Sequence, residues 1–397
     1  MPGTRATTLL LAFDAGARTE RPEENGMAHF LEHLVFKGGE KFANHHAVNE
    51  TAERMGGVLN AYTSHDLVAF HITVRAEAVG EALDLLTDFV GRPKLDAEDV
   101  DRERGVVIQE INRSKDQPSV VAEHLIDHAA FGEHPLGRPV LGPEEHLRSF
   151  SRDAIVAFRK RRWSRGAAIV AGNLEHLDDA VANELLERLP DSDPAHPPEP
   201  FEPAPSLSTE RKVEERDTNQ SHLRMLYRPE IDHSDSKARA ALTVYSTLLG
   251  GSMSSRLFEE IREQRGLCYS VWSIDHAFAD MPVLQLGSGL ESGKCGEAYR
   301  RMREIVAELH KDGPRPEEVD RARAYAAGRR ILMYENTNAV ARYSAAQLIV
   351  YDAPIDVEGA IRELDEVTYD EVVEAAASLD PETLAVACVG PHTPDEF

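Results

Sequence analysis

The sequence predicts an α+β fold built twice, as two similar domains that each contain a mainly antiparallel or mixed β-sheet with helices packed on one side. Three observations lead to this prediction. Segments with the two-residue periodicity of strands alternate with segments whose apolar residues recur at helical spacing. A proline-rich stretch divides the chain into halves of similar size. Each half ends in a short apolar run closed by glycine, at 167–172 and 384–390.

The dividing stretch runs from Leu189 to Thr209 and holds seven prolines among acidic and small residues. Proline fixes φ and removes a backbone donor, so neither a helix nor a sheet continues through this stretch. We therefore expect an N-terminal domain at 1–188, a linker at 189–209 and a C-terminal domain at 210–397. The length of 397 residues is typical of two or three domains.

The elements of the N-terminal half follow from local patterns. Residues 7–13 form an apolar run, and 67–74 alternate between more and less apolar side chains, so both are predicted to be strands. Apolar residues at helical spacing predict four helices, at 27–36, 78–90, 97–111 and 119–131.

The C-terminal half repeats this style. Residues 283–290 have the composition of a strand. Helical spacing predicts four helices, at 240–249, 255–265, 296–309 and 316–334.

The charge balance excludes some classes of function. Lys and Arg number 44 against 69 Asp and Glu, a formal net charge of −25, which argues against nucleic acid or an anionic membrane as the main partner. The apolar run at 9–13 is too short for a signal sequence, and no later run approaches a membrane span. Three cysteines without a CxxC pair do not make a disulfide framework. We expect a soluble cytoplasmic protein.

One motif carries chemistry, His29-Phe-Leu-Glu32-His33. Residues four apart lie one turn apart on the same helix face, so two imidazoles can hold one metal ion, with Glu32 directed into the same space. HxxEH is the inverted counterpart of the HExxH zinc-protease signature. The flanks are apolar, and two buried histidines with a glutamate would be costly without a ligand. We therefore favour a metal site over a solvated helix face.

Two other pairs of histidines are weaker candidates for a metal site. His124 and His128 have the same spacing with Asp127 between them, but no third ligand is evident nearby, and we interpret them as surface or inter-helix residues. His45 and His46 are adjacent and would face apart on any regular element, so we expect them in a loop.

The third ligand has two candidates in the segment ERGVVIQEI. Glu103 and Glu110 are two helical turns apart and therefore share a face. Val106 and Val107, beside Ile111, predict that this helix is mostly buried. Periodicity does not choose between the two glutamates.

At this point the sequence resembles the M16 metallopeptidases, the inverzincins, and within them the processing-peptidase-like branch. The resemblance covers nearly the whole chain and rests on five motifs in the order of the family. They are HFLEHLVFKG at 29–38, GGVLNAYTS at 56–64, ERGVVIQEI at 103–111, HPLGRPVLG at 134–142 and GGSMSSRLFEEIREQRGLCYSV at 250–271.

The resemblance implies roles for particular residues. His29, His33 and Glu110 would be ligands of one zinc ion per chain, with Glu32 as the base that activates water. Glu103 would orient a ligand from outside the coordination sphere. The resemblance also implies that Asn60 and Ala61 lie on an edge strand that pairs with an extended substrate, and that Arg262 and Tyr269 stabilise the oxyanion. Main-chain pairing with an edge strand gives affinity with little demand on substrate sequence. A guanidinium and a tyrosine hydroxyl can donate hydrogen bonds to the oxyanion that forms on the attacked carbonyl.

The sequence also departs from the family pattern. The family has a further strand before the one at 7–13, so we expect either a sheet without an edge strand or a shortened start. Gly39 stands where threonine is common, and Asp66 stands where glutamate is common. None of these changes removes a catalytic group.

The predicted function is that of a zinc metalloendopeptidase acting on peptides or unfolded segments. Its substrates would be extended, and the acidic charge of the chain would favour basic ones. A homodimer is implied, because two repeats are half of the chamber that the family builds. The alternative is a non-catalytic scaffold that binds peptides as one subunit of a heterodimeric M16 peptidase.

Overall fold

A computed structural model of the chain describes residues 1, 3–190, 201–206 and 208–397. They form two compact units that interleave in sequence. The first unit comprises 1–112, 139–202 and 333–355, and the second comprises 113–138, 203–332 and 356–397. The sequence halves do not predict this exchange of segments. The proposed linker at 189–209 lies largely outside the described residues, and the domain boundaries stay a prediction.

The first unit contains an antiparallel sheet with the strand order β2-β3-β1-β4. Its strands are β1 (Ala6–Phe13), β2 (Val58–Thr63), β3 (Val68–Arg75) and β4 (Gly166–Gly172). β1 lies centrally, with Leu9 opposite Ile72 of β3 and opposite Val170 of β4. β2 lies at the edge of this sheet, and no strand of the described residues pairs with its other side.

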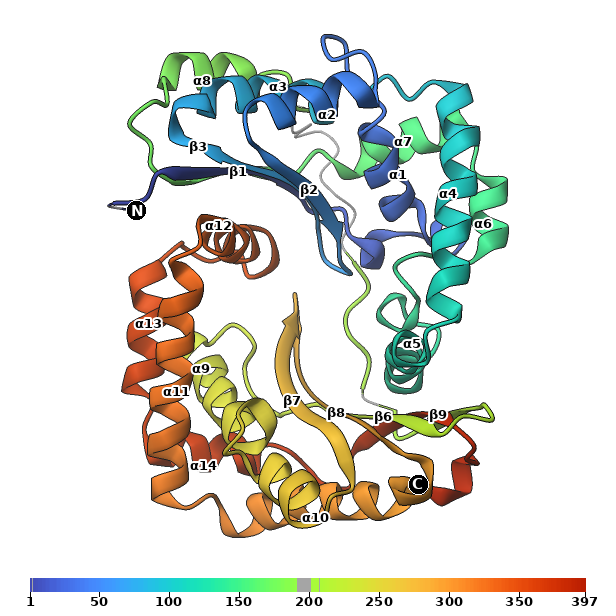
Figure 1. The fold of residues 1–397 in the computed structure, drawn as a ribbon, viewed down its shortest axis with the longest axis vertical. Coiled ribbons are helices and arrows are strands. Elements are labelled where there is room, and N and C mark those ends of the chain that lie inside the picture. Colours follow the sequence, from blue (N-terminus) through green and yellow to red (C-terminus); the bar gives the residue numbers. More distant parts are fainter. Residues whose placement is uncertain (2, 191–200, 207) are drawn as a thin grey trace. The chain divides into compact units, whose positions relative to one another are not determined.

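Most helices of the first unit pack on one face of this sheet (Figure 1). Leu9, Leu11 and Phe13 of β1 point to that face, into a core shared with α1 and α3. The helices of the unit are α1 (Met27–Val35), α2 (His45–Arg54), α3 (Val79–Gly91), α4 (Ala97–Lys115, whose last residues enter the second unit), α6 (Glu144–Ser149), α7 (Arg152–Arg162), α8 (Asp179–Leu186) and α12 (Thr337–Ala345).

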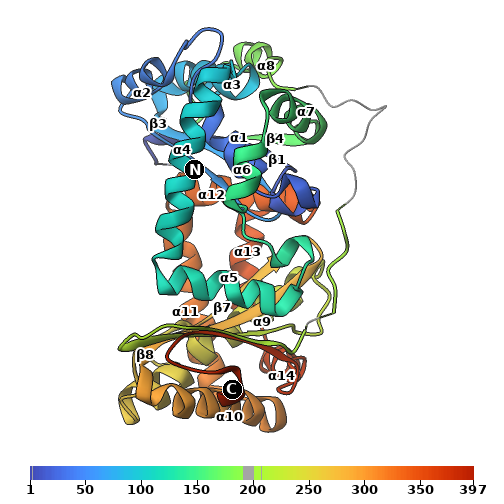
Figure 2. The same cartoon turned by 90° about the vertical axis from the view of Figure 1, so that its right-hand side faces the viewer.

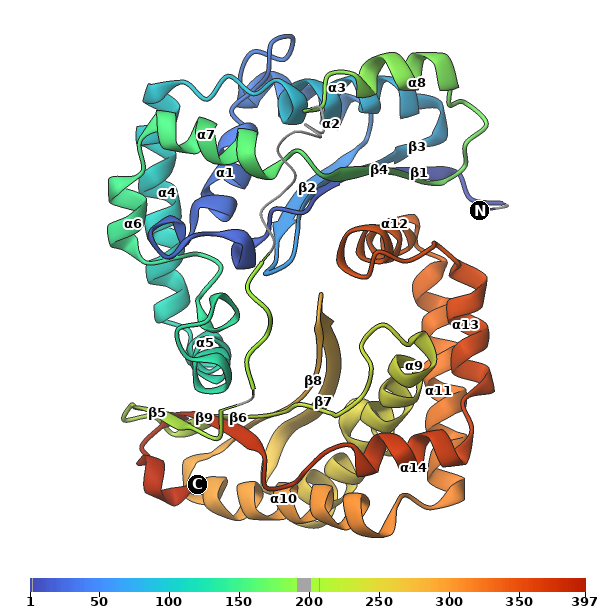
Figure 3. The same cartoon turned by 180° about the vertical axis from the view of Figure 1, so that it is seen from behind.

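The opposite face of this sheet is covered by α12, a helix from far along the chain (Figure 3). Thr8 points to this face, and its hydroxyl lies 2.8 Å from that of Thr337 on α12. Asn338 of the same helix lies within hydrogen-bond distance of His71 on β3, at 2.9 Å. The sheet is therefore enclosed on both faces.

The second unit contains a five-stranded sheet with the order β5-β9-β6-β8-β7. Its strands are β5 (Arg211–Glu215), β6 (Gln220–Tyr227), β7 (Cys268–Phe278), β8 (Met281–Glu291) and β9 (Leu384–Gly390). β5 runs parallel to β9, and the other pairs are antiparallel. The sheet is mixed, as expected. Among the described residues, the first sheet has no counterpart of β5.

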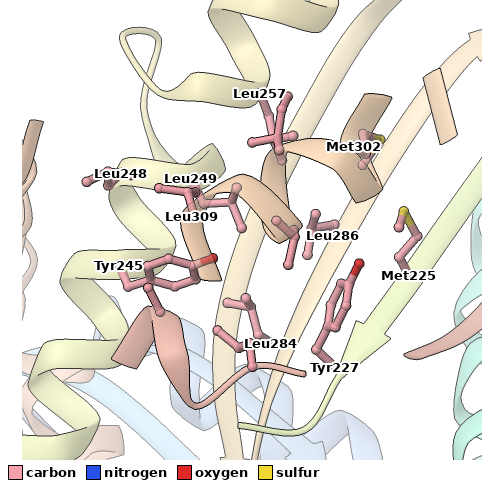
Figure 4. Close-up of a cluster of buried hydrophobic side chains, with 14 of the residues drawn as sticks. Met225, Tyr227, Tyr245, Leu248, Leu249, Leu257, Leu284, Leu286, Met302 and Leu309 are labelled. Atoms are coloured by element: carbon pink, nitrogen blue, oxygen red, sulfur yellow. The ribbon is translucent and has the colours of Figure 1, made fainter. Parts of the chain in front are cut away.

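Helices again cover both faces (Figure 2). One face carries the main core, drawn in Figure 4, in which Met225, Tyr227, Leu284 and Leu286 of the sheet meet Tyr245 of α9 and Met302 of α10. The other face carries α5, whose Ile126 and Ala130 pack near Ala385 of β9. The helices are α5 (Pro118–Phe131), α9 (Ser236–Ser246), α10 (Cys295–Asp312), α11 (Pro316–Tyr334, whose last residues enter the first unit), α13 (Val357–Glu366) and α14 (Tyr369–Ala377).

Two local predictions are wrong. α4 is not mostly buried, because Val106 is exposed while Val107 and Ile111 are buried, so the helix is amphipathic. His45 and His46 lie in the first turn of α2, where Asn44 caps the helix by accepting a hydrogen bond from the backbone of Ala47.

None of the described helices has the length and apolar content that crossing a membrane requires.

Candidate metal centre

The helix α1, which carries His29, Glu32 and His33, has an unusual N-terminus. Gly26 precedes it with φ of 99°, and a Cβ at this position would stand 2.7 Å from the carbonyl oxygen of Leu141, so glycine is required. No side chain of Gly26 can cap the helix. The buried carboxylate of Glu20 instead accepts hydrogen bonds from the backbone N–H groups of Gly26 (3.0 Å) and Ala28 (2.7 Å).

Three side chains from α1 and α4 converge. The Oε2 atom of Glu110 lies 3.4 Å from Nε2 of His33 and 3.9 Å from Nε2 of His29. The ligand atoms of these three residues all lie within 4.8 Å of one another, a grouping that could hold a metal ion. The structure therefore brings together the three residues that the sequence analysis expects as ligands.

Glu103 lies on the other side of His33. Its Oε1 atom accepts a hydrogen bond from Nδ1 of His33 at 2.9 Å, and its other oxygen pairs with Lys37. A histidine that donates through Nδ1 leaves the lone pair of Nε2 free for a metal. The geometry thus separates the two glutamates that periodicity leaves equivalent: Glu110 faces Nε2 and Glu103 faces Nδ1.

The two imidazoles differ in their electrostatic surroundings. Burial, together with the charge of His33, lowers the pKa of His29 to about 4, so this ring is neutral at pH 7 without metal. Burial alone would lower the pKa of His33, but hydrogen bonds to Glu103 and Glu110 raise it to about 9. A divalent cation would take the place of the proton on Nε2, between His33 and Glu110, while the Nδ1 proton would stay in the hydrogen bond to Glu103.

Glu32 lies on the same helix, between the two histidines in sequence. Its Oε2 atom accepts a hydrogen bond from the hydroxyl of Thr63, the last residue of β2. Burial raises the pKa of Glu32, against the lowering effect of the Thr63 hydroxyl. A carboxyl with a raised pKa is better matched to accepting and returning a proton near neutral pH.

The residues fit a zinc ion. Two imidazole nitrogens and one carboxylate oxygen are the ligand set of catalytic zinc sites, which keep a fourth position open for water or substrate. The neutral ring of His29 and the Nε2 atoms directed at Glu110 supply this set. His29 and Glu32 are both buried, which keeps the site's dielectric low.

The predicted substrate-binding residues lie on the edge strand β2. Asn60 pairs in register with His71 of β3, and Ala61 pairs with Phe70. Asn60 is exposed, and its side-chain oxygen accepts a hydrogen bond from the backbone N–H of Ala61 at 2.9 Å. An extended chain that paired with Ala61 would have to displace this amide oxygen.

Arg262 and Tyr269 belong to the second unit and lie near each other there. The guanidinium of Arg262 stands 5.5 Å from the ring centroid of Tyr269 and 4.6 Å from that of Phe258. The backbone is irregular at both: Arg262 lies in a π-helical segment at Phe258–Gln264, and Tyr269 lies at a shift of register in the edge strand β7. Tyr269 is 83% exposed. Such irregularities often redirect side chains at functional sites.

Comparison with known proteins matches two family models to the chain. The model described as insulinase, peptidase family M16, matches residues 1–144, and the model described as peptidase M16 inactive domain matches 149–325. The uncharacterized zinc protease YmxG of Bacillus subtilis is 30% identical over 98% of this chain and 94% of its own length. An uncharacterized zinc protease of Streptomyces coelicolor is also 30% identical, over 98% of this chain and 86% of its own.

This chain belongs to peptidase family M16.

Solved structures show the same fold. A protease from Helicobacter pylori superimposes on this M16 chain with a TM-score of 0.88 at 20% identity, covering 98% of this chain and 95% of the other. A structure from Pseudomonas fluorescens described as a peptidase M16 inactive domain has the same TM-score and identity, with 98% and 94% covered. The similarity extends over both compact units.

The second histidine pair of this M16 chain does not gather ligands. His124 is half-buried, and His128 contacts Glu133 at 3.6 Å. Neither histidine belongs to a group of three possible metal ligands among the residues that the structure describes. Their interpretation as surface or inter-helix residues stays a prediction.

Sequence reasoning about the M16 site misses three supporting residues. Thr63 binds Glu32, Lys37 pairs with Glu103, and Glu20 caps α1. Lys37 follows the HxxEH motif by one helical turn, which places it on the same face and could have indicated its contact with an acid. Thr63 and Glu20 come from other segments, and no local spacing points to them.

Proposed function

We propose that this M16 family member is a zinc metalloendopeptidase that hydrolyses peptides or unfolded polypeptide segments. The observation that carries the proposal is the convergence of His29, His33 and Glu110 beside Glu32. Family membership and relatives named zinc proteases support it.

The chain's own residues would divide the work as follows. His29, His33 and Glu110 hold the cation, and Glu103 fixes the ring of His33 through Nδ1. Zinc bound there supplies Lewis-acid polarisation of the substrate carbonyl and lowers the pKa of water. Glu32, oriented by the Thr63 hydroxyl, takes the proton from the attacking water and passes it to the leaving amine.

Residues outside the metal centre would bind the substrate and its oxyanion. The outer side of β2 at Asn60 and Ala61 suits main-chain pairing once the Asn60 amide oxygen leaves the N–H of Ala61, and such pairing gives affinity with little demand on sequence. The guanidinium of Arg262 and the exposed hydroxyl of Tyr269 are suitable donors to the negative charge that develops on the attacked carbonyl.

The protein's metal content, oligomeric state, cellular location and branch of the family are also proposed. We propose one zinc ion per chain, a homodimer, a cytoplasmic location and membership of the processing-peptidase-like branch. The homodimer is attractive because one chain carries both the zinc motif and the Arg262–Tyr269 pair. The net charge of −25 would favour basic, extended peptides, and equal cleavage of basic and acidic peptides at low salt would contradict this preference.

The decisive experiment combines peptide cleavage with metal analysis. Wild-type protein is incubated with a peptide library, with and without a chelator, and products are identified by mass spectrometry. Glu32→Gln is expected to keep its fold and its zinc while losing activity by at least about a hundredfold. Glu50→Gln, an exposed acid on α2, is the matched control. Zinc-loaded wild-type protein that cleaves no peptide would refute the proposal.

A scaffold function is the second candidate, because the model matched by residues 149–325 is described as an inactive domain. It predicts that the chain binds peptides without cleaving them. Gel filtration of the protein expressed alone, with an activity assay on the eluted peak, distinguishes the two. Activity in a peak of dimer mass supports a homodimeric peptidase, whereas inactivity that a related subunit relieves supports a heterodimer.

A further inference from the structure

A second group of potential metal ligands lies within the second unit. It consists of Cys295, the first residue of α10, Cys388 in β9, and His392 just after that strand. Their ligand atoms all lie within 4.8 Å of one another, and all three residues are buried. Residues from a helix start, a strand and the C-terminal segment thus meet at one point.

The separation of the two sulfur atoms distinguishes a cation from a disulfide. Sγ of Cys295 lies 3.9 Å from Sγ of Cys388. A disulfide requires about 2.05 Å between the sulfurs. Two thiolates on a tetrahedral zinc ion, each about 2.3 Å from the metal, stand about 3.8 Å apart. The observed distance excludes a disulfide; it fits a contact between two thiols and also fits two ligands on one ion.

His392 has a hydrogen-bond partner at each ring nitrogen. Its Nδ1 atom lies 3.0 Å from Oε2 of Glu396, and its Nε2 atom lies 2.7 Å from the hydroxyl of Ser221. A metal ion at Nε2 would displace the hydroxyl of Ser221, which itself donates a hydrogen bond to Ser292, while the carboxylate of Glu396 would fix the ring through Nδ1.

The backbone around this group is shaped for close approach. Gly390 lies between the strand and His392, and a Cβ there would stand 2.4 Å from Oγ of Ser221 and 3.1 Å from Cδ2 of His392. Glycine therefore permits the contact between Ser221 and His392.

We propose that Cys295, Cys388 and His392 form a second, structural metal site that binds one zinc ion and ties α10, β9 and the C-terminal segment together. Two thiolates and one imidazole are ligands that zinc prefers. This site differs from the centre on α1 in containing sulfur, and it does not depend on the proposed peptidase function.

Cobalt substitution tests the proposal, because thiolate ligands give cobalt(II) an intense near-ultraviolet charge-transfer absorption that histidine and glutamate ligands do not give. The experiment uses the full-length chain with His29→Ala and His33→Ala, so that the centre on α1 no longer binds metal. One cobalt ion per chain with the charge-transfer band is the expected result. Adding Cys388→Ser should abolish both the band and the bound metal, whereas Cys268→Ser, at a cysteine outside the group, should leave both unchanged.

Other outcomes of these experiments would contradict the proposed metal site. A folded double histidine variant that binds no cobalt, or binds it without the band, overturns the proposal, as does a Cys295–Cys388 disulfide in peptides mapped under non-reducing conditions. If these variants do not fold, wild-type protein decides the question. Titration of its thiols with an organomercurial should release one zinc ion as two thiols react, and failure to release zinc refutes the site. Loss of peptidase activity in wild type would leave all these readouts unaffected.

Discussion

Replacement of Glu103 tests whether an acid outside the coordination sphere sets the metal affinity. The carboxylate is 4% exposed and accepts a hydrogen bond of 2.9 Å from Nδ1 of His33. A hydrogen bond to a charged group contributes about 1.5–3 kcal/mol, and a neutral one about 0.5–1.5 kcal/mol. Glu103→Gln keeps an acceptor oxygen but loses its charge, so it should cost about 1–1.5 kcal/mol, or about tenfold in zinc dissociation constant.

Glu103→Ala removes the acceptor altogether. The loss should reach about 2–3 kcal/mol, which corresponds to about 30- to 160-fold weaker zinc binding. Lys37 loses its partner in both variants, so the protein will also be less stable and must be assayed below its unfolding transition. Zinc affinity should decrease from wild type to Glu103→Gln and again to Glu103→Ala.

Competition with a chromophoric chelator measures these affinities directly. Glu98→Ala, at an exposed acid on the same helix, is the control and should bind zinc as wild type does. Excess zinc should restore much of the activity of both Glu103 variants, because no ligand has been removed. A folded Glu103→Ala protein whose zinc affinity stays within about twofold of wild type would refute the orienting role that we infer from the geometry.

Three further predictions concern residues that support the two units. Thr63→Val should lower kcat about tenfold with KM and zinc content unchanged, because Glu32 loses its hydroxyl donor. Thr63→Ser should restore the wild-type kcat. Equal kcat values of Thr63→Val and wild type in steady-state assays would contradict this role. Glu20→Ala should lower the free energy of unfolding, measured in urea, by about 2–4 kcal/mol, because two N–H groups at the N-terminus of α1 lose their acceptor. The control Glu23→Ala, at an exposed acid, should change this free energy by less than about 0.5 kcal/mol. Burial alone would raise the pKa of Glu318, but hydrogen bonds from Arg256 and Arg315 lower it to about 2, below its unfolded value of 4.5. Its stabilisation, about 3 kcal/mol, is therefore present above pH 4.5 and lost as the pH falls through 2, and Glu318→Gln should flatten the acid limb of the stability profile; identical limbs in both proteins would refute the linkage.

Local sequence determined those elements whose patterns are complete within a few residues. The alternation at 67–74 needs no distant partner to indicate a strand, and β3 spans Val68–Arg75. HxxEH places its two histidines on one helix face by helical geometry alone. The apolar flanks also indicated correctly that α1 is buried.

The sequence did not determine which faces the helices present to one another. The spacing of Glu103 and Glu110 put both on one face of α4, and only the resemblance to the M16 family distinguished them. In the structure, the packing of α4 against α1 directs one glutamate to Nδ1 of His33 and the other to Nε2. Val106 was misjudged for the same reason, because an apolar side chain next to Val107 points away from the core once the helix is docked.

What only the tertiary structure decided are the encounters between distant segments. α12 closes the face of the first sheet, Thr63 reaches Glu32, and Cys295 meets Cys388 across 93 positions of sequence. Periodicity reports on neighbours within a few turns, and these contacts arise when long-range packing buries the surfaces that local structure creates. The sequence thus determined the strands and helices and the metal-binding motif, while the folded chain decided which side chains support that motif.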